Sequence, residues 1–462
     1  MRNRSGIYAS VITLGVLAVG VKFGMHVYHQ THQHHHTVIR VVKRSLVTHQ
    51  ITDDTPVRVL GLRRFPYPYD AMLAISSDAD DETLRKFNLI HEFINTREKT
   101  PFGYYGLGLP FADSVFMFNG SNLPKPVDVG NAPRSEEMSW FRGVSNQSLD
   151  AAEINHYIHA GWIDTLHSYG DFSRVNPHQT LFTRQLAKQA VDALQSHGDT
   201  LTVWTDHGNQ SNVDDFGSFG KAKFYNYQQG ADPKSPYYHA NITIPYGVRF
   251  VWPDVASDVY GRTSMIYPLT LPDKQKVWGF WRYTSSGMTQ DGSPIWDWTV
   301  GDLSQQITLQ KLEALEKNHD YCIIAQHLEA LNARLPLPQN AIDALWTLDH
   351  QYTEKKLLVA TTSQLLNYNV VQQYLHYHVT YDHGNTDIHI DDIRDPVDGT
   401  FRPTLTDLRG ITFYTSSPAR TVIEIGDTPV PASDIMDNPS DSVGKSIGIK
   451  WFTWSTKNYV ET

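Results

Sequence analysis

Short apolar runs alternate with longer helical patterns over most of this chain, and this alternation limits the fold more than any other sequence feature. A strand, a helix and a further strand in succession build a parallel sheet with helices packed on its faces. We therefore predict an α/β chain in which residues 57–370 form a (β/α)7-8 barrel rather than an open sheet. The predicted strands are Met72–Ser77, Val115–Phe118, Trp162–Leu166, Leu201–Thr205, Arg249–Trp252, Trp278–Tyr283, Tyr321–Ala325 and Leu357–Thr361. The predicted helices are Glu82–Thr96, Asp150–His159, Leu181–Ser196, Leu303–Lys317 and Gln339–Tyr352.

The pattern changes after about residue 371, where no further helical periodicity occurs. Short strand-like runs are separated there by Pro, Gly and Asp, which favour turns. These runs are Tyr374–Thr380, Thr386–Ile390, Gly410–Thr415, Thr421–Ile425 and Ile447–Thr453. They predict an all-β, sandwich-like domain over residues 371–462, appended to the barrel.

The first residues contain an apolar run from Ile7 to Val21 that follows Arg2 and Arg4. The run is shorter than the roughly 20 residues that usually span a bilayer, and both a cleaved signal peptide and an uncleaved anchor fit it. Because no small-x-small cleavage site follows, we predict a signal anchor over residues 1–25 and a His-rich stalk over residues 26–56. The anchor would tie the chain to a membrane, with the two arginines in the cytoplasm and the body on the periplasmic or extracellular side.

The charge of the chain is divided unevenly. The first 50 residues hold six of the 39 basic residues and no acidic one, so the remainder carries 33 basic and 49 acidic residues, a formal −16. An acidic body argues against a nucleic-acid-binding protein, which needs a basic surface. The single Cys322 excludes a disulfide framework and a cysteine-ligated zinc site.

Acidic side chains and histidines follow several of the predicted strands. Asp78, Asp80 and Asp81 come after the first strand, and three carboxylates so close together repel one another unless a cation or a proton compensates. His167 and Asp171 follow a neighbouring strand, and strand ends of a parallel barrel meet on one face. Together they predict a mixed nitrogen and oxygen site for a divalent metal, Zn²⁺ first, with Mn²⁺, Co²⁺ or Ni²⁺ as alternatives. Under the other interpretation, Asp80 or Asp81 caps the following helix and His167 is an ordinary buried histidine.

Further strand ends predict the walls of a substrate groove. Asp206 and His207 follow the strand Leu201–Thr205, although an Asp-His-Gly-Asn sequence also suits a tight turn. Arg282 and Trp298 lie near the next strand ends, and a tryptophan in a groove can stack on a sugar ring. We therefore predict that these four residues bind substrate.

Three of these segments resemble motifs of the polysaccharide deacetylase superfamily (NodB-like, carbohydrate esterases). The run Met72-Leu-Ala-Ile-Ser-Ser-Asp78-Ala-Asp80-Asp81 resembles the first motif, a strand that ends in two acids. His167-Ser-Tyr-Gly-Asp171 resembles the second motif, His-x-x-x-His, with Asp in place of the second His. Tyr321-Cys-Ile-Ile-Ala-Gln-His327 resembles the late strand that ends in a catalytic His. The resemblance covers roughly residues 57–366 and implies a deacetylase-like barrel.

The resemblance also implies a role for each matched residue. Asp78 would be the catalytic base, and His327 the general acid. Asp80, His167 and Asp171 would hold the metal. The sequence departs from the family pattern in two places, because Ala79 separates acids that are usually adjacent and because residue 171 is Asp. The first departure leaves Asp81 as a competitor of Asp80 for the metal.

The function expected from these features is a metal-dependent hydrolase that removes acetyl groups from a polysaccharide at the cell envelope. A glycoside hydrolase that uses paired carboxylates on a similar barrel is the first alternative. A catalytically degenerate protein that binds polysaccharide or takes part in its assembly is the second.

Overall fold

A computed structural model describes residues 57–119, 136–174, 176–207, 212–217, 227–328, 337–382 and 384–460. Within these ranges no helix is both long and apolar enough to cross a bilayer. The predicted anchor (residues 1–25) and stalk (residues 26–56) lie outside the described residues. The described residues belong to one compact unit.

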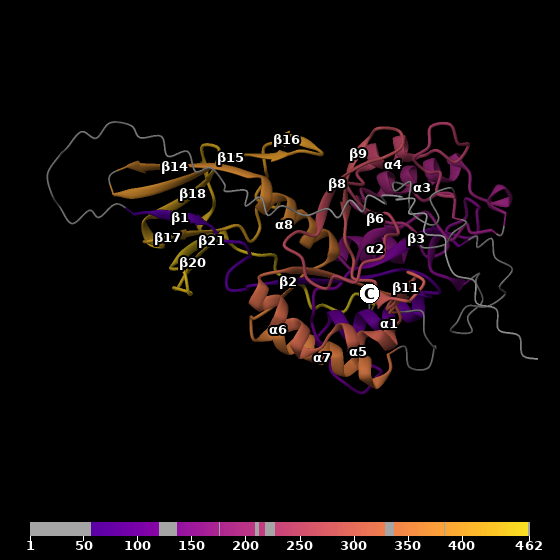
Figure 1. Ribbon diagram of the computed structural model, residues 1–462, viewed down its shortest axis with the longest axis horizontal. Coiled ribbons are helices and arrows are strands. Elements are labelled where there is room, and N and C mark those ends of the chain that lie inside the picture. Colours follow the sequence, from indigo (N-terminus) through magenta and orange to yellow (C-terminus); the bar gives the residue numbers. More distant parts are fainter. Residues whose placement is uncertain are drawn as a thin grey trace, which may run out of the picture. The chain divides into compact units, whose positions relative to one another are not determined.

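A ten-stranded sheet forms the centre of this unit (Figure 1). Its main path runs β12-β2-β3-β5-β6-β7-β9-β8, while β13 pairs with β2 and β4 pairs with β3. All neighbouring strands are parallel except β8 and β9. The strands are β2 (Met72–Ser77), β3 (Asp113–Phe118), β4 (Ser139–Phe141), β5 (Ile163–His167), β6 (Val203–Thr205), β7 (Phe250–Trp252), β8 (Ile266–Thr270), β9 (Lys276–Phe280), β12 (Tyr321–Gln326) and β13 (Leu358–Val359).

The helices are distributed unevenly along this sheet. In the described ranges they are α1 (Leu84–Asn95), α2 (Ala151–Ala160), α3 (Arg184–His197), α4 (Ala240–Tyr246), α5 (Leu303–Gln306), α6 (Leu309–Asn318), α7 (Gln339–Thr353) and α8 (Thr362–Tyr374), with short 3₁₀ turns η2 (Pro177–Gln179), η3 (Val300–Asp302), η4 (Pro418–Arg420) and η5 (Ala432–Asp434). The prediction of a (β/α)7-8 barrel is therefore wrong, because β7, β8 and β9 follow one another with no helix between them and β8 runs against the other strands.

A tight turn explains this difference. The backbone N–H of Lys274 donates to the carbonyl of Leu271, and Lys274 has a φ of +76°. Such a turn returns the chain at once and joins strands in the antiparallel sense, whereas a parallel neighbour needs a long crossover. Beyond β9, the backbone of Tyr283 pairs with Ile324 of β12, so the sheet curls back toward β12, the strand at its other end.

Strand β2 shows how the sheet is buried on both faces. All six of its residues are buried. Met72 and Ala74 pack in one apolar cluster with residues of α8, whereas Leu73 and Ile75 pack in another with residues of α5, α6 and α7. Alternate side chains of a strand point to opposite faces, and a continuous apolar run is typical of a parallel strand covered on both sides.

Residues from Leu375 onward, together with one early strand, build two further sheets. The first contains β14 (Leu375–Asp382), β15 (Asn385–Asp395), β16 (Gly399–Phe401), β18 (Thr421–Ile425) and β19 (Thr428–Pro429), of which β14, β15 and β18 lie side by side (Figure 1). The second has the order β1-β17-β21-β20, with β1 (Val59–Leu62), β17 (Thr412–Thr415), β21 (Ser446–Ile449) and β20 (Ile435–Asn438). Ile390 and Phe413, one from each sheet, share an apolar cluster with α8 and β2. The β region is thus packed directly on the central sheet.

Candidate metal centre

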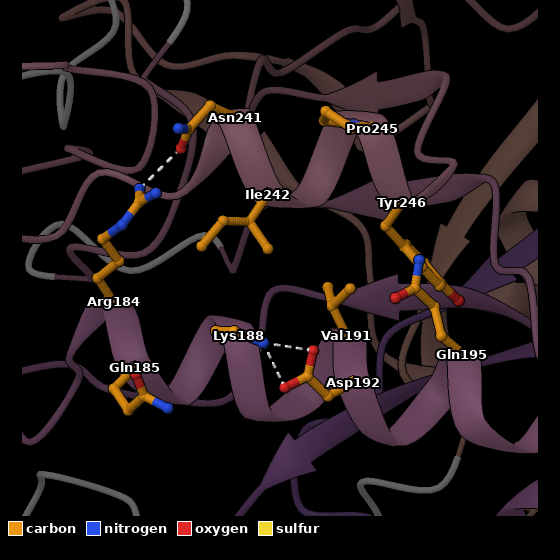
Figure 2. A pocket seen from close by; sticks show the side chains of 10 residues that line it. All are labelled: Arg184, Gln185, Lys188, Val191, Asp192, Gln195, Asn241, Ile242, Pro245 and Tyr246. Atoms are coloured by element: carbon orange, nitrogen blue, oxygen red, sulfur yellow. Dashed lines mark hydrogen bonds and ion pairs between the residues drawn. The ribbon is translucent and has the colours of Figure 1, made fainter.

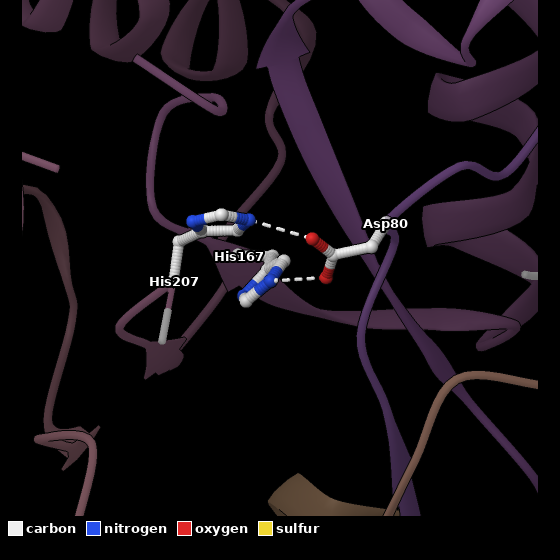
Figure 3. Close-up of side chains that lie close together, drawn as sticks. All are labelled: Asp80, His167 and His207. Carbon is white, nitrogen blue, oxygen red and sulfur yellow. Dashed lines mark hydrogen bonds and ion pairs between the residues drawn. The ribbon is translucent and has the colours of Figure 1, made fainter. Parts of the chain in front are cut away.

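Three side chains at the carboxyl ends of β2, β5 and β6 form a compact group (Figure 3). The Asp80 carboxylate lies 2.8 Å from Nε2 of His167 and 2.6 Å from Nε2 of His207. One ligand atom from each residue lies within 4.8 Å of the other two. Two imidazole nitrogens and one carboxylate oxygen are a donor set that suits zinc and other divalent transition metals. The residues present therefore fit a divalent cation.

The surroundings of His167 favour a metal ligand. Its Nδ1 lies 2.9 Å from Oγ1 of Thr205 and 3.2 Å from the Thr205 carbonyl oxygen, which can only accept a hydrogen bond. When Nδ1–H donates to these oxygens, the Nε2 lone pair faces Asp80. Such an oriented histidine is typical of metal centres. A lone pair that faces a carboxylate needs a proton or a cation between the two groups.

His207 enters the group from the turn after β6, the strand that pairs with β5. Its backbone N–H donates to Oγ of Ser168 at 3.0 Å and to Oδ1 of Asp215 at 3.1 Å, which fixes the turn after β6. Burial disfavours the charged imidazolium, but Asp80 and Asp171 outweigh burial and raise the pKa of His207 well above its usual value. Burial would raise the pKa of Asp80, but the neighbouring His207 and His167 have the larger effect and hold that pKa well below the ordinary range. The group thus attracts positive charge.

Asp78 is held by a different partner. Its two carboxylate oxygens accept hydrogen bonds from Arg282 at 2.9 and 2.8 Å, and both side chains are buried. The Arg282 guanidinium also lies 4.4 Å from the ring centre of Trp252. Burial opposes the charge of Asp78, but Arg282, with help from His167, lowers its pKa below the usual value. Asp78 is therefore an ionised carboxylate beside the metal group.

His327 completes the ring of side chains around Asp80. Its Nε2 lies 3.2 Å from Oδ2 of Asp80, and its Nδ1 lies 3.3 Å from the carbonyl oxygen of Trp298. Burial disfavours protonation of this imidazole, but the carboxylates of Asp80 and Asp78 raise its pKa. Both ring nitrogens of His327 thus face acceptor oxygens, an arrangement that favours the charged imidazolium, and the carboxylate concerned is the one that faces the two ligand histidines.

The structure places the other predicted ligands outside the compact group. Asp171 lies behind His207, with its Oδ1 4.0 Å from Nδ1 of His207, and it accepts a hydrogen bond from the N–H of Ser173. The group contains Asp80 rather than Asp81, whose backbone N–H donates to Glu137. Neither acid caps helix α1, because the Thr83 side chain accepts from the N–H of Lys86 and fills that role.

The predicted substrate residues take other positions. His207 belongs to the metal group instead of a groove wall, and Arg282 is buried against Asp78. Asp206 is fully buried and accepts from Nε1 of Trp204 at 2.8 Å, so it supports the turn that carries His207. Trp298 is half-buried, and its ring lies 5.7 Å from that of His327.

Asp254 is a site residue that the sequence interpretation missed. It follows β7 as Asp78 follows β2, so the same strand-end rule would have found it. Its backbone has a φ of +54°, in the left-handed region that Asp tolerates better than most residues. Burial raises the pKa of Asp254 to about 7, although His207 and Arg282 act against this rise. A half-buried carboxyl that titrates near neutral pH thus joins the edge of the site.

A surface depression of 590 Å³ lies elsewhere, between α3 and α4 (Figure 2). Its charged side chains are bonded to close neighbours. Arg184 donates to Asn241 at 2.7 Å, and Lys188 donates to the Asp192 carboxylate at 2.7 and 2.6 Å. Because these groups are already paired, the strand-end cluster is the better candidate for chemistry.

No protein-family model, curated protein or solved structure matches this chain. The site itself and the three short motifs are therefore the features that indicate a function.

Proposed function

We propose that this chain is a metal-dependent hydrolase that removes acetyl groups from a polysaccharide at the cell envelope. The observation that supports this proposal is the convergence of His167 and His207 on the Asp80 carboxylate. A mixed histidine and carboxylate ligand set, with a carboxylate and a histidine of raised pKa beside it, is suited to hydrolysis of an acyl bond. The location at the envelope depends on the predicted N-terminal anchor.

The cation would be held by Asp80, His167 and His207. When bound, it supplies Lewis acidity to the acyl carbonyl and to a water molecule. Zinc is the first choice, with manganese, cobalt or nickel as alternatives. Asp171, next to His207, orients this ligand rather than binding the ion itself.

Asp78 would act as the general base. Arg282 keeps it ionised, so it can accept a proton from the attacking water. The water oxygen forms a bond to the acyl carbon, and the bond from that carbon to the sugar nitrogen or oxygen breaks. His327 donates its proton to the departing amine or hydroxyl group, and acetate leaves. Asp78 lies 3.7 Å from Nδ1 of His167, and His327 lies 3.2 Å from Asp80, so each residue adjoins a proposed ligand of the same cation.

The glycoside hydrolase alternative fits the site less well. That chemistry needs one carboxyl group that stays protonated beside a second that is ionised. Asp78 and Asp80 both have lowered pKa values, so the protonated carboxyl would have to come from a further residue such as Asp254, whose pKa is raised to about 7. A two-carboxylate mechanism would also leave the convergence of His167 and His207 on Asp80 without a role. The degenerate, binding-only alternative differs from our proposal in one measurable respect, because it releases no acetate.

The test combines metal content with acetate release from acetylated polysaccharides. The purified full chain should hold about one transition metal per molecule, and chelation should abolish acetate release. His167→Ala should lose both metal and activity, whereas His178→Ala, an exposed histidine of η2, should keep both. A full metal complement in His167→Ala would refute the ligand assignment, and metal binding without acetate release from any substrate would refute the activity.

A further inference from the structure

A small hairpin stands apart from the central sheet, next to the candidate metal centre. Within the described ranges, strands β10 (Ser285–Met288) and β11 (Pro294–Trp296) pair with each other and with no further strand. The base of the hairpin is anchored, because the N–H of Asp297 donates to the carbonyl of Thr284 and the Gln306 side chain donates to the carbonyl of Asp297. Its far end carries two large apolar side chains that face solvent, Met288 and Ile295, which are 50% and 45% exposed.

One face of this hairpin forms a row of apolar side chains. Alternate residues of an extended strand share a face, so Pro294, Trp296 and Trp298 lie on the same side, and Met288 pairs with Pro294. The rings of Trp296 and Trp298 are stacked, with centres 4.6 Å apart and planes at 19°. At about 3.3 Å per residue, the row from residue 294 to residue 298 spans about 13 Å.

This row leads to the reacting groups. The Trp298 ring meets the His327 ring edge-on, and Nε2 of His327 lies 3.2 Å from Asp80. In addition, the backbone of Thr299, the residue after Trp298, pairs with that of His327 in a parallel bridge. The aromatic row is therefore continuous with the metal group, and a bound molecule can touch both.

The residue types and the charge of the hairpin indicate which ligand the row binds. Over residues 285–298 the acidic residues are Asp291, whose carboxylate accepts from Thr289 and from the N–H of Ser293, and the buried Asp297, and no basic residue occurs there. A row of indole and aliphatic side chains on a hairpin without basic residues suits the apolar face of a sugar ring better than an anionic group. A length of about 13 Å exceeds that of a single ring.

We propose that the row formed by Met288, Pro294, Trp296 and Trp298 binds the sugar rings that flank the reacting one, so that the substrate is a chain of uncharged pyranose residues rather than a single sugar. This inference rests on the proposed function only in taking the metal group as the reacting centre. It adds the substrate class and a requirement for length.

The experiment measures binding separately from activity. The full chain is titrated with N-acetylglucosamine and with its β-1,4-linked oligomers of two to five residues, by calorimetry and by tryptophan fluorescence. The affinity of the wild type should rise at least about tenfold from monomer to trimer, and Trp296→Ala should lose this rise. Trp296→Phe, which keeps a flat ring, should retain much of it. Trp346→Ala is the matched control, because Trp346 is 37% exposed and lies on α7, where its ring packs edge-on against Tyr104.

The outcomes test the binding role of the row separately from the proposed activity. Equal affinity for monomer and trimer, no binding of any oligomer, or equal behaviour of Trp296→Ala and Trp346→Ala would overturn the role of the row. In acetate-release assays, Trp296→Ala should raise KM for the trimer by a larger factor than KM for the monomer, because only the trimer reaches the row. Length-dependent binding without acetate release from any oligomer would refute the proposed activity and leave the binding role supported.

Discussion

Arg282 and Asp78 lie 204 positions apart in the sequence, and their side chains form a two-fold hydrogen-bonded ion pair in the protein interior, at 2.9 and 2.8 Å. Arg282 follows β9, and the pairing of Tyr283 with Ile324 brings its backbone next to β12 and β2. The pair therefore depends on the curl of the sheet, and it links the fold to the ionisation of the proposed base.

Replacing Arg282 by Lys should shift the acidic limb of the activity profile to higher pH. Lys cannot make the two parallel hydrogen bonds, so the pKa of Asp78 should rise from its lowered value. As the pH falls, the ionised base would then be lost earlier than in the wild type. Acetate release measured from pH 4 to pH 9 tests this expectation. Arg262→Lys is the control, because Arg262 stacks on Trp281 away from Asp78; an identical shift in both variants would contradict the assignment.

Replacing Asp78 by Asn should destabilise the fold as well as abolish activity. Arg282 is 1% exposed and would become an uncompensated buried charge. Breaking a buried ion pair in this way costs about 3–5 kcal/mol. Urea denaturation of the wild type and the variant at pH 7 measures the difference. A loss of activity with no loss of stability would show that the ion pair contributes nothing to folding.

Parts of this site could be predicted from the sequence because they depend on local pattern. The bounds of β2 agree with the predicted strand Met72–Ser77, since a fully buried parallel strand is a continuous apolar run. The positions of Asp80, His167 and His327 at strand ends followed from the same reasoning. Strand β8 (Ile266–Thr270) is not among the predicted strands, and its antiparallel direction depends on one tight turn at Lys274.

The choice between Asp171 and His207 also lay beyond local pattern. Asp171 stands four positions after His167, as a spacing motif requires, but its carboxylate lies behind His207. His207 reaches the group because β6 pairs with β5, and sequence spacing contains no information about that pairing. The N-cap of α1 could not be predicted either. Thr83 fills that position, so Asp80 does not cap the helix, but Thr and Asp are both favoured N-cap residues and the sequence does not choose between them.

His207→Ala and Asp171→Asn should separate a metal ligand from its supporting residue. The first variant removes one of the three ligand atoms and should lose the metal during dialysis. The second removes only the charge behind His207 and should keep the metal, with an affinity about 10–100-fold weaker. Calorimetric titration with Zn²⁺ after chelation measures both. The reverse order, with Asp171→Asn the more damaging change, would support the ligand set expected from the sequence motif.

Asp254→Asn should change how stability depends on pH. The pKa of Asp254 is raised to about 7 in the folded chain, whereas an unfolded Asp titrates near 4. Between these values the folded state binds more protons, so the wild type should lose stability as the pH rises from about 4 to 7 through this group. The variant lacks that loss and should be more stable by on the order of 1–3 kcal/mol at pH 8 and equally stable near pH 4. Thermal or urea unfolding at both pH values measures the difference; a constant difference would assign it to packing instead.

The segment that contains Trp454 and Tyr459 should stabilise helices α1 and α2. The ring of Tyr459 packs edge-on against the buried Trp162, with centres 5.4 Å apart, and Nε1 of Trp454 donates to the carbonyl of Asn95 at the end of α1. Because Tyr459 is only partly buried, Tyr459→Ala should cost about 1–3 kcal/mol of unfolding free energy, below the range for fully buried aromatic residues. Tyr381→Ala, at a 54% exposed tyrosine of β14, should change it little. Urea denaturation measures both variants, and equal stabilities would show that the C-terminal segment rests on α1 and α2 without contributing to their stability.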